Sequence, residues 1–218
     1  KKKRKPPMNH PLRHLVAVML LMAGLSSVLQ AQSSPDEFIR TISQSVLDDL
    51  KADRSLQSGD IERLNVLVER KVMPYVDFQR MTALAVGRNW RAATPEQQRA
   101  LMQEFRRLLL LTYSGAVRQV NDLTFQVRPV RGKPDDDEII VRTQVLRPGR
   151  EPILIDYRMQ KAGSSWKIFD LNIMGLWLVE HYRNQFAQVV GASGIDGLIQ
   201  SLREKNQTLT MGGGSAKQ

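Results

Sequence analysis

The chain has 218 residues, contains no cysteine and carries a formal net charge of +10 at pH 7. Without cysteine it can have no disulfide framework, no thiolate nucleophile and no zinc–thiolate site. Six of its positive charges and none of its acidic residues lie within residues 1–31, so the remaining chain has a net charge of +4. This modest charge gives no argument for nucleic-acid binding, and it is compatible with transient contact with an anionic membrane surface.

Residues 1–31 have the order of a secretory signal peptide. Basic residues precede an uncharged apolar run at residues 15–29, and small and polar residues around Ala31 follow it. A transmembrane helix needs about 20 apolar residues, so this shorter run predicts export and cleavage after Ala31. We interpret Met8 as the start of translation, because an export segment follows it. The KKKRK sequence at residues 1–5 resembles a nuclear localisation signal, which leaves a basic nuclear protein as a distant alternative.

Three successive helices are predicted at the start of the exported chain. Apolar residues recur at helical spacing over residues 36–57, and a Ser-Gly-Asp tract ends that helix. A second helix begins at Ile61 and ends or kinks at Pro74. A third helix covers residues 78–87. The first part of the exported chain is therefore expected to be helical.

The Thr-Pro-Glu-Gln sequence at residues 94–97 is the clearest local signal of a helix start. The threonine can cap the helix, the proline suits its first turn, and the glutamine can complete a capping box. The helix that follows is predicted to extend to about Val120. Residues 108–111 are apolar around most of the helix, so we expect neighbours on more than one side of it.

The apolar period then changes from that of a helix to that of a strand. Apolar and polar residues alternate over residues 123–128, 139–145, 153–160 and 166–173, and polar or glycine-containing turns separate these segments. The pattern predicts a four-stranded antiparallel meander with one apolar face for the helices.

Two more helices are predicted at residues 176–190 and 195–206. The fold class is therefore α+β, with a curved antiparallel sheet of about four strands wrapped by helices. We expect one domain over residues 32–210, between the leader at residues 1–31 and a disordered, glycine-rich tail at residues 211–218. Such a fold can close around its core or leave a deep pocket, and periodicity does not distinguish the two.

The sequence contains no HExxH, GxSxG, Walker or GxGxxG motif, so we predict that it is not an enzyme. The acidic run at residues 135–138 lacks the alternating spacing of a calcium loop. His181 lies in a polar helical segment, and we predict no metal site. Asp156 falls on the polar side of its strand. Asp170 has apolar residues around it and leaves one alternative open, an enzyme with a buried acid as in ketosteroid isomerase.

Several segments, in a fixed order, carry a resemblance to one protein family. They are VMPYVDF at residues 72–78, AVGRNWRAATPEQQ at residues 85–98, EFRRLL at residues 104–109, Thr-Tyr at residues 112–113, WKIFD at residues 166–170 and GIDGLI at residues 194–199. Their order and spacing resemble the MlaC family of periplasmic phospholipid-binding proteins, also called the toluene-tolerance or ABC-transporter auxiliary family. The resemblance spans about residues 36–206, nearly all of the exported chain.

The resemblance implies a soluble phospholipid carrier in the periplasm of a Gram-negative bacterium. Such a carrier moves phospholipid between an outer-membrane lipoprotein–porin complex and the substrate-binding subunits of an inner-membrane ABC transporter, and so maintains outer-membrane lipid asymmetry. It also implies a fold like that of nuclear transport factor 2 (NTF2-like), with acyl chains held between sheet and helices. We expect a monomer with no cofactor other than bound phospholipid. A carrier of hopanoids or other polycyclic lipids is a second alternative.

The physics of a lipid carrier predicts the shape of its site. Each buried methylene contributes about 0.8 kcal/mol, so exposing two chains of roughly 16 carbons to water costs on the order of 25 kcal/mol. The carrier must therefore enclose the tails, whereas the hydrated head group can stay outside. We expect a deep apolar pocket, a polar rim and little selectivity among head groups.

Candidates for the pocket wall come from periodicity alone. The strand candidates are the apolar residues that alternate toward the helices: Phe125, Val127, Val141, Val145, Ile153, Ile155, Tyr157, Phe169, Leu171 and Ile173. The helix candidates are Tyr75, Leu109, Tyr113 and Val117. Each of these is as compatible with an ordinary core position as with contact to a ligand.

Four arginines, Arg88, Arg91, Arg106 and Arg107, lie close to the predicted start of the fourth helix. Their density suggests a basic surface that docks on a transporter or a membrane, and a solvated helix face is the alternative. The VMPYVDF and NWRAATPEQ segments are interpreted as determinants of the fold and not as ligand contacts.

Overall fold

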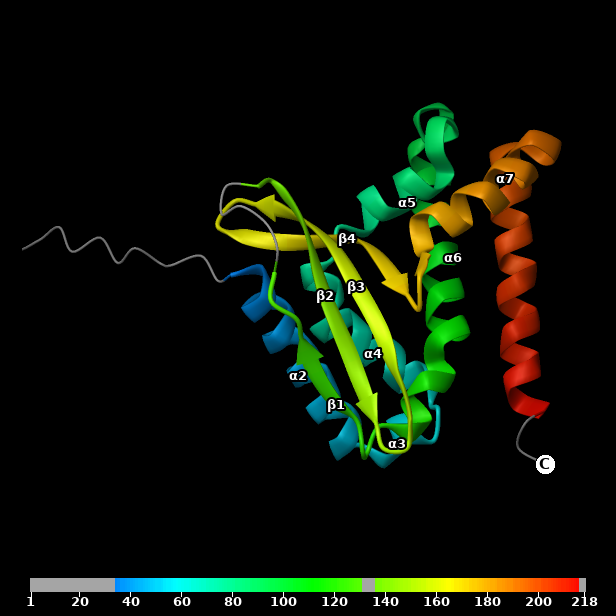
Figure 1. The fold of residues 1–218 in the computed structure, drawn as a ribbon. Helices are drawn as coiled ribbons and strands as arrows, with labels where there is room; N and C mark the ends of the chain where they lie inside the picture. Colours follow the sequence, from blue (N-terminus) through cyan, green and yellow to red (C-terminus); the bar gives the residue numbers. More distant parts are fainter. Residues whose placement is uncertain (1–33, 131–135, 216–218) are drawn as a thin grey trace, which may run out of the picture. The chain divides into compact units, whose positions relative to one another are not determined.

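The computed structural model describes residues 34–130 and 136–215, so the predicted leader at residues 1–31 lies outside it. In chain order the helices and 3-10 segments are α2 (Pro35–Ala52), α3 (Arg54–Gln57), α4 (Ile61–Lys71), η2 (Met73–Tyr75), α5 (Phe78–Val86), η3 (Gly87–Ala92), α6 (Pro95–Tyr113), η4 (Ser114–Gln119) and α7 (Leu178–Ser215). The strands are β1 (Thr124–Val127), β2 (Glu138–Arg147), β3 (Arg150–Ala162), β4 (Ser165–Ile173) and β5 (Leu176–Trp177). The α+β class is confirmed (Figure 1), and the short strand β5 is added to the four that were predicted.

The helices of the first half differ from the predicted ones at two boundaries. The predicted helix over residues 36–57 is interrupted at Asp53, whose side chain accepts a hydrogen bond from the backbone N–H of Ser55 and so starts the short helix α3. The fourth helix ends at Tyr113 and continues as the 3-10 segment η4, short of Val120. Both differences reflect local hydrogen bonding that an apolar period does not report.

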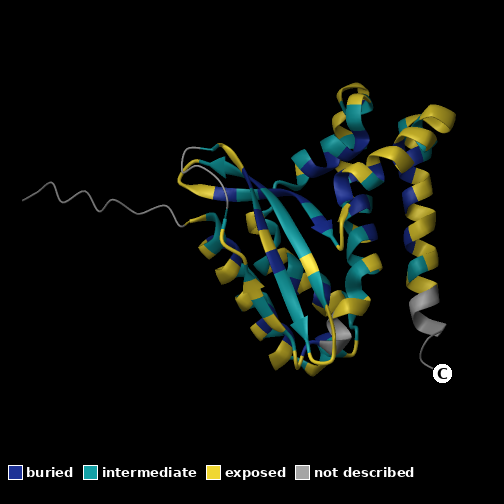
Figure 2. Ribbon diagram, in the orientation of Figure 1, coloured by how far each residue is buried: buried dark blue, intermediate teal, exposed yellow. Residues whose placement is uncertain are grey.

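The five strands form an antiparallel meander in the order β1-β2-β3-β4-β5. Val141 lies opposite Tyr157, which lies opposite Leu171, so these three residues share the face of the sheet toward the helices. Helix α2 packs on this face through Phe38 and Ile39. The opposite face carries mostly polar side chains. Figure 2 shows that β2 and β3 consist mainly of buried and half-buried residues.

A β-bulge in β4 interrupts the alternation of its side chains. Arg158 lies opposite Asp170, and the next residue of β3, Met159, lies opposite Ile168, so Phe169 is the extra residue on β4. Phe169 is buried, and the guanidinium carbon of Arg80 lies 3.7 Å from the centre of its ring. The bulge thus places Phe169 against α5, whereas strict alternation predicts a position on the pocket wall.

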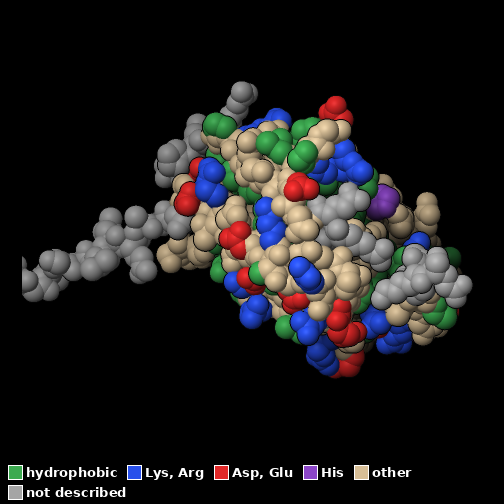
Figure 3. All heavy atoms as spheres, turned by 90° about the horizontal axis from the view of Figure 1, so that it is seen from below, with side chains coloured by type: hydrophobic (Ala, Val, Ile, Leu, Met, Phe, Trp, Pro, Cys, Tyr) green, Lys and Arg blue, Asp and Glu red, His purple; other side chains and the backbone are tan. Residues whose placement is uncertain are grey.

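Ion pairs on the surface join α2, α3 and α4. Arg63 of α4 donates to the carboxylate of Asp53 at 3.1 Å, and Arg70 donates to that of Asp49 on α2 at 3.2 Å. Figure 3 shows the wider pattern, in which Lys and Arg side chains are interspersed with Asp and Glu on the face seen from below. Exposed pairs of this kind contribute about 1 kcal/mol or less, so they orient these helices more than they stabilise them.

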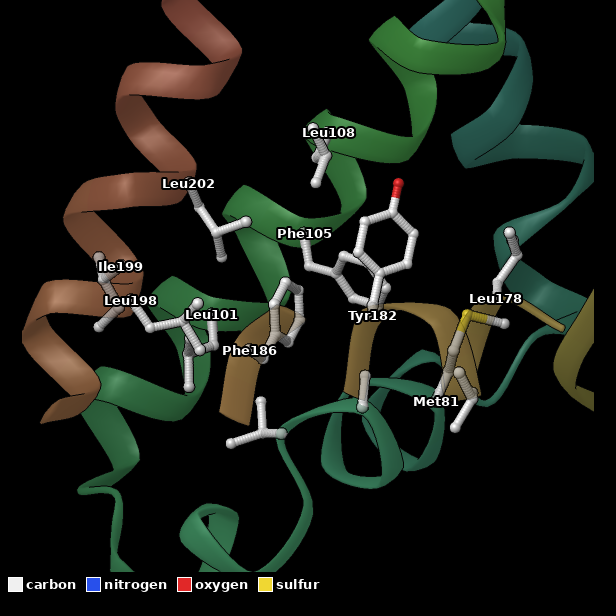
Figure 4. Close-up of a cluster of buried hydrophobic side chains, with 13 residues drawn as sticks. Met81, Leu101, Phe105, Leu108, Leu178, Tyr182, Phe186, Leu198, Ile199 and Leu202 are labelled. Carbon is white, nitrogen blue, oxygen red and sulfur yellow. The ribbon is translucent and has the colours of Figure 1, made fainter. Parts of the chain in front are cut away.

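The largest hydrophobic cluster lies where α5, α6 and α7 meet (Figure 4). The ring of Phe105 on α6 packs edge-on against the rings of Tyr182 and Phe186 on α7, at centroid distances of 4.9 and 5.2 Å. Met81 of α5 and Leu198 of α7 are buried in the same cluster. Edge-to-face aromatic pairs have a preferred geometry, so this cluster fixes how the three helices lie against one another.

Two of the sequence segments noted above have clear structural roles. Thr94 and Gln97 form the predicted capping box, because each backbone N–H donates to the other side chain, at 2.9 and 3.2 Å. In VMPYVDF, the Asp77 N–H donates to the carbonyl of Ile168 on β4 at 2.8 Å, and the Asp77 carboxylate accepts from the Gln160 side chain at 2.9 Å. These contacts start α6 and attach the segment before α5 to the sheet.

The two C-terminal helices predicted from the sequence are the two arms of α7, which bends at Gly194. That residue has φ 70° and ψ −172°, a backbone conformation that residues with a Cβ rarely adopt. The second arm lies alongside α6 (Figure 1). Helix α7 extends to Ser215 and so enters the segment 211–218, for which no regular structure was expected.

Candidate functional site

An apolar cavity of about 290 Å³ lies between the sheet and the helices α2, α4, α5 and α6. Its lining consists of Val46, Leu50, Leu64, Asn65, Leu67, Val68, Val72, Met73, Val76, Phe78, Met81, Arg106, Leu109, Leu110, Tyr113, Ser114 and Leu171. Most of these side chains are aliphatic or aromatic, and Arg106 is the one charged residue among them. A lining of this composition suits a hydrocarbon better than a polar metabolite.

Polar contacts at the surface join two of the helices that border the cavity, α2 and α4. Lys71 of α4 donates to the Ser45 hydroxyl of α2 at 2.9 Å, and the Asp49–Arg70 pair joins the same two helices. The side chains that these two helices contribute to the lining, such as Val46 and Val68, are mostly aliphatic. They border the space between the helices and the sheet without filling it.

Arg106 of the cavity lining forms an ion pair with a residue just outside the lining. The Arg106 guanidinium of α6 pairs with the Glu69 carboxylate of α4, and the Arg106 side chain is 33% exposed. Glu69 lies one helical turn beyond Asn65, which also lines the cavity. Because its side chain is partly exposed and also lines the cavity, Arg106 connects the apolar cavity to the exposed surface between α4 and α6. Burial raises the pKa of the nearby Tyr113 hydroxyl, another residue of the lining, above its usual value.

The structure brings three of the predicted pocket residues, Leu109, Tyr113 and Leu171, together on the cavity wall. Other candidates lie on the sheet but in different surroundings. Those that pack in the cluster between the sheet and α2 are Phe125, Val127, Val141 and Tyr157. Those that are half-buried on the same face of the sheet are Val145, Ile153 and Ile155, and Ile173 packs against the cluster of α5, α6 and α7.

Three candidates remain. Two of them, Tyr75 and Phe169, are not part of the cavity lining. Tyr75 is 37% exposed, and its ring packs edge-on against that of Phe38 at a centroid distance of 5.5 Å. Phe169 is the bulge residue beneath Arg80. The side chain of Val117 falls outside the described part of the structure.

The contributions of α2 and α4 to the cavity were not expected from the sequence, nor was that of the VMPYVDF segment, which was assigned to the fold alone but supplies Val72, Met73, Val76 and Phe78 to the lining. Val46, Leu50, Leu64 and Val68 all line the cavity, although their helical spacing indicates only a buried face. A usable signal is that α4 contains no aromatic residue. Small aliphatic side chains that face one another across a helix pair fill less volume than aromatic ones, so such a pair is where a void can persist.

The four arginines singled out in the sequence lie on two different elements, η3 and the second half of α6. Arg106 lines the cavity, whereas its neighbour Arg107 lines a polar groove between α6 and α7, together with Arg203. Arg88 and Arg91 lie in η3. The density of arginines in the sequence therefore does not correspond to a single docking surface built from all four.

Asp170 is buried, with 1% of its surface exposed, but it is not part of the cavity lining. Its carboxylate accepts hydrogen bonds from the backbone N–H groups of Leu171 and Val179, at 2.8 and 3.0 Å, and Arg158 lies 3.3 Å away. Burial raises the pKa of Asp170 above its usual value, against the effect of these donors. The acid thus holds the start of α7 to β4, and it does not occupy the position that the enzyme alternative requires.

Within the described residues, no group of three or more His, Cys, Asp or Glu side chains could hold a metal ion. No helix in the same part of the chain has both the length and the apolar character needed to span a bilayer. The candidate site is therefore the apolar cavity with the Arg106–Glu69 pair at its wall.

Comparison with known proteins gives consistent relatives. A family model described as MlaC protein matches residues 40–204. The intermembrane phospholipid transport system binding protein MlaC of Haemophilus influenzae is 22% identical over 177 residues, covering 80% of this chain and 83% of that protein. Toluene tolerance protein ttg2D of Pseudomonas putida is 23% identical over 180 residues, covering 82% of this chain and 83% of that protein.

A solved structure shows the same fold at higher sequence identity. It is that of a phospholipid-binding protein from Ralstonia solanacearum in complex with a phospholipid. The two chains are 40% identical with a TM-score of 0.79, and the match covers 82% of this chain and 99% of the other. The matched family region takes in every helix and strand that borders the cavity except the first residues of α2. The chain therefore belongs to the MlaC family.

Proposed function

We propose that this protein is a periplasmic carrier that encloses the acyl chains of a phospholipid in the cavity between the sheet and α2, α4 and α6. It exchanges lipid with an outer-membrane lipoprotein–porin complex on one side. On the other side it exchanges lipid with the substrate-binding subunits of an inner-membrane ABC transporter. The transfer maintains the lipid asymmetry of the outer membrane.

The cavity lining is the observation that carries this proposal. The lining is almost entirely apolar and is deep enough to be bordered by four helices and β4. A relative that is 40% identical was solved with a phospholipid bound. The shared fold, together with an apolar cavity that suits acyl chains, supports the same class of cargo here. The signal peptide predicted at residues 1–31 supports a site of action outside the cytoplasm.

Loading requires the cavity to widen. Its volume of about 290 Å³ lies at the lower end of the range of roughly 300–1,000 Å³ that is typical of small-molecule sites. Two acyl chains left in water would cost on the order of 25 kcal/mol, so the widened cavity must enclose both of them. The exposed Arg106–Glu69 pair, which crosses from α6 to α4, is a weak connection that contributes about 1 kcal/mol or less, and it opposes the widening little.

The test is to recover the cargo from cells. The full precursor is expressed in a Gram-negative host, and the periplasmic protein is purified without detergent. Native mass spectrometry then gives the mass of the complex, and lipid extraction identifies what is bound. We expect phospholipid at near-stoichiometric amounts with several head groups, because the cavity encloses the tails only.

Other outcomes would contradict the proposal in distinguishable ways. A protein that is empty under these conditions would argue against a phospholipid carrier. A bound polycyclic lipid, in place of phospholipid, would favour the hopanoid alternative. Protein retained in the cytoplasm with its leader intact would contradict the proposed location while leaving the binding activity open to the same extraction.

A further inference from the structure

Arg106, the charged residue in the cavity lining, lies between the apolar part of that lining and the exposed surface. Arg106 is followed along the same stripe of α6 by Leu109, Leu110 and Tyr113, all of which line the cavity. Its side chain is one-third exposed, whereas the apolar stem borders the cavity. An arginine can place its stem on an apolar surface and its guanidinium at the edge of water. Arg106 therefore marks a boundary between hydrocarbon and solvent.

The Glu69 carboxylate pairs with the Arg106 guanidinium. The two side chains belong to different helices, α4 and α6, so their pairing closes the wall at this point. Glu69 itself is exposed and is not part of the cavity lining. A guanidinium offers a planar fork of N–H donors that fits carboxylates and phosphates equally well. A carboxylate and a phosphate would therefore compete for the same donors.

We propose that Arg106 binds the phosphodiester group of the lipid, which displaces Glu69 from the guanidinium. The inference rests on the proposed function, because the lipid tails must occupy the cavity for the phosphate to reach this point. The displacement also separates α4 from α6 at the wall, so the same exchange that binds the phosphate gives the tails room. When lipid leaves, Glu69 pairs with Arg106 again, and no half-buried charge is left alone.

This site discriminates by phosphate and not by head group. The alcohol attached to the phosphate extends into solvent, so phospholipids with different head groups bind alike. A diacylglycerol with the same tails lacks the phosphodiester and leaves the Arg106–Glu69 pair intact. The ratio of bound phospholipid to bound diacylglycerol is therefore the quantity that reports on Arg106.

The test measures that ratio in four forms of the full mature chain. Delipidated protein is incubated with vesicles of dioleoylphosphatidylglycerol that contain a minor fraction of dioleoylglycerol, and both lipids are counted after extraction. Arg106→Gln should lower the ratio about tenfold, equivalent to about 1.4 kcal/mol. Glu69→Gln removes the competing carboxylate and should raise the ratio or leave it at the wild-type value. Arg107→Gln, on the same helix but facing the other groove, should leave it unchanged.

Diacylglycerol uptake serves as the control for an intact cavity. It should stay at the wild-type level in Arg107→Gln, and it should not fall below that level in Arg106→Gln or Glu69→Gln, which lack the pair that closes the wall. A wild-type ratio in Arg106→Gln would overturn the inference. A drop in Glu69→Gln as large as that in Arg106→Gln would also overturn it, because the pair would then be only a structural connection. Wild-type protein that takes up neither lipid would overturn the proposed function together with this inference.

Free phosphate is the other source of the same chemistry. Inorganic phosphate added in excess should leave phosphatidylglycerol uptake unchanged, because a free anion has no tails to hold it at Arg106. If inorganic phosphate reduces the uptake by wild-type protein to the level of Arg106→Gln, the site binds free anions, and the assignment to a lipid phosphodiester is wrong.

Discussion

The two sides of α6 face apolar regions that differ in how completely side chains fill them. On one side, Phe105 packs against the aromatic rings of Tyr182 and Phe186 on α7. On the other side, Leu110 borders the cavity, and Leu109, which lies between the two sides, borders the cavity and also packs against the cluster of α5, α6 and α7. Both sides are apolar, and both belong to one helix. The difference arises from what stands opposite, aromatic residues on α7 and short aliphatic residues on α2 and α4.

A filled core and an open apolar cavity are thus built from the same residue types. Burial of apolar surface drives both, but only a filled region gains the full set of contacts between close-packed atoms. The filled region therefore supports the fold, and the unfilled region is available to a ligand of similar chemistry. Substitutions in the filled region should therefore mainly change stability, and substitutions in the unfilled region should mainly change ligand binding.

The largest effect on stability is expected in the filled region. Phe105→Ala should lower the free energy of unfolding by about 3–5 kcal/mol, because it removes a fully buried ring and leaves a cavity. Leu110→Ala should lower it by only about 1–2 kcal/mol, since Leu110 is half-buried and borders the cavity. Urea unfolding of lipid-free protein measures both. Equal losses for the two variants would contradict the distinction between the two sides of α6.

Filling the cavity should remove lipid binding without a comparable loss of stability. Val68→Trp places a large ring in the space that Val68 borders, and we expect the amount of bound phospholipid to fall at least about tenfold. The free energy of unfolding should change by about 1 kcal/mol or less, because the ring occupies a void. Lipid extraction and urea unfolding give the two quantities.

Val66 offers a matched control on the same helix. It is 61% exposed, so Val66→Trp adds the same ring outside the cavity and should leave lipid binding at the wild-type level. If both tryptophan variants bind lipid as the wild type does, the tails lie elsewhere in the molecule.

A smaller effect on stability is expected at Asp170. It precedes the cavity residue Leu171 in the chain, but its carboxylate accepts a hydrogen bond from Val179 at the start of α7 and so belongs to the filled region. Burial raises the pKa of Asp170 above its unfolded value of about 3.9. Its contribution to stability is therefore fully present below that value and is lost as the pH rises through the raised pKa. Asp170→Asn does not titrate, so the free energy of unfolding of wild type minus variant should decrease from about pH 4 to pH 8.

Urea unfolding at both pH values measures this difference. A difference that increases with pH would mean that the hydrogen bonds from Leu171 and Val179 and the pairing with Arg158 outweigh the effect of burial on the Asp170 pKa.

Local features of the fold were readable from the sequence. The capping box at Thr94 and Gln97 and the alternation along β2 and β3 depend on neighbouring residues, and the structure contains them as predicted. The bulge at Phe169 was not readable, because it depends on how β4 pairs with β3. The two-residue strand β5 is too short to produce a period.

The cavity was less predictable than the fold because it depends on side chains that meet across elements. Periodicity identifies the buried faces of α4 and α6 but does not show whether the facing side chains fill the space between them. Leu109 and Leu171 were therefore found as part of a larger set of buried residues, and the α4 wall was not. The pairing of Arg106 with Glu69 is likewise invisible in the sequence, where Arg106 looks equivalent to Arg107.

Photo-crosslinking tests the central claim, that lipid tails occupy the cavity, most directly. The protein is loaded with a phospholipid that carries a diazirine in its acyl chain, irradiated, digested and mapped by mass spectrometry. We expect crosslinks in α4 (Ile61–Lys71) and in the second half of α6 (Pro95–Tyr113), where both helices border the cavity. Crosslinks confined to the polar face of the sheet or to the groove between α6 and α7 would contradict it.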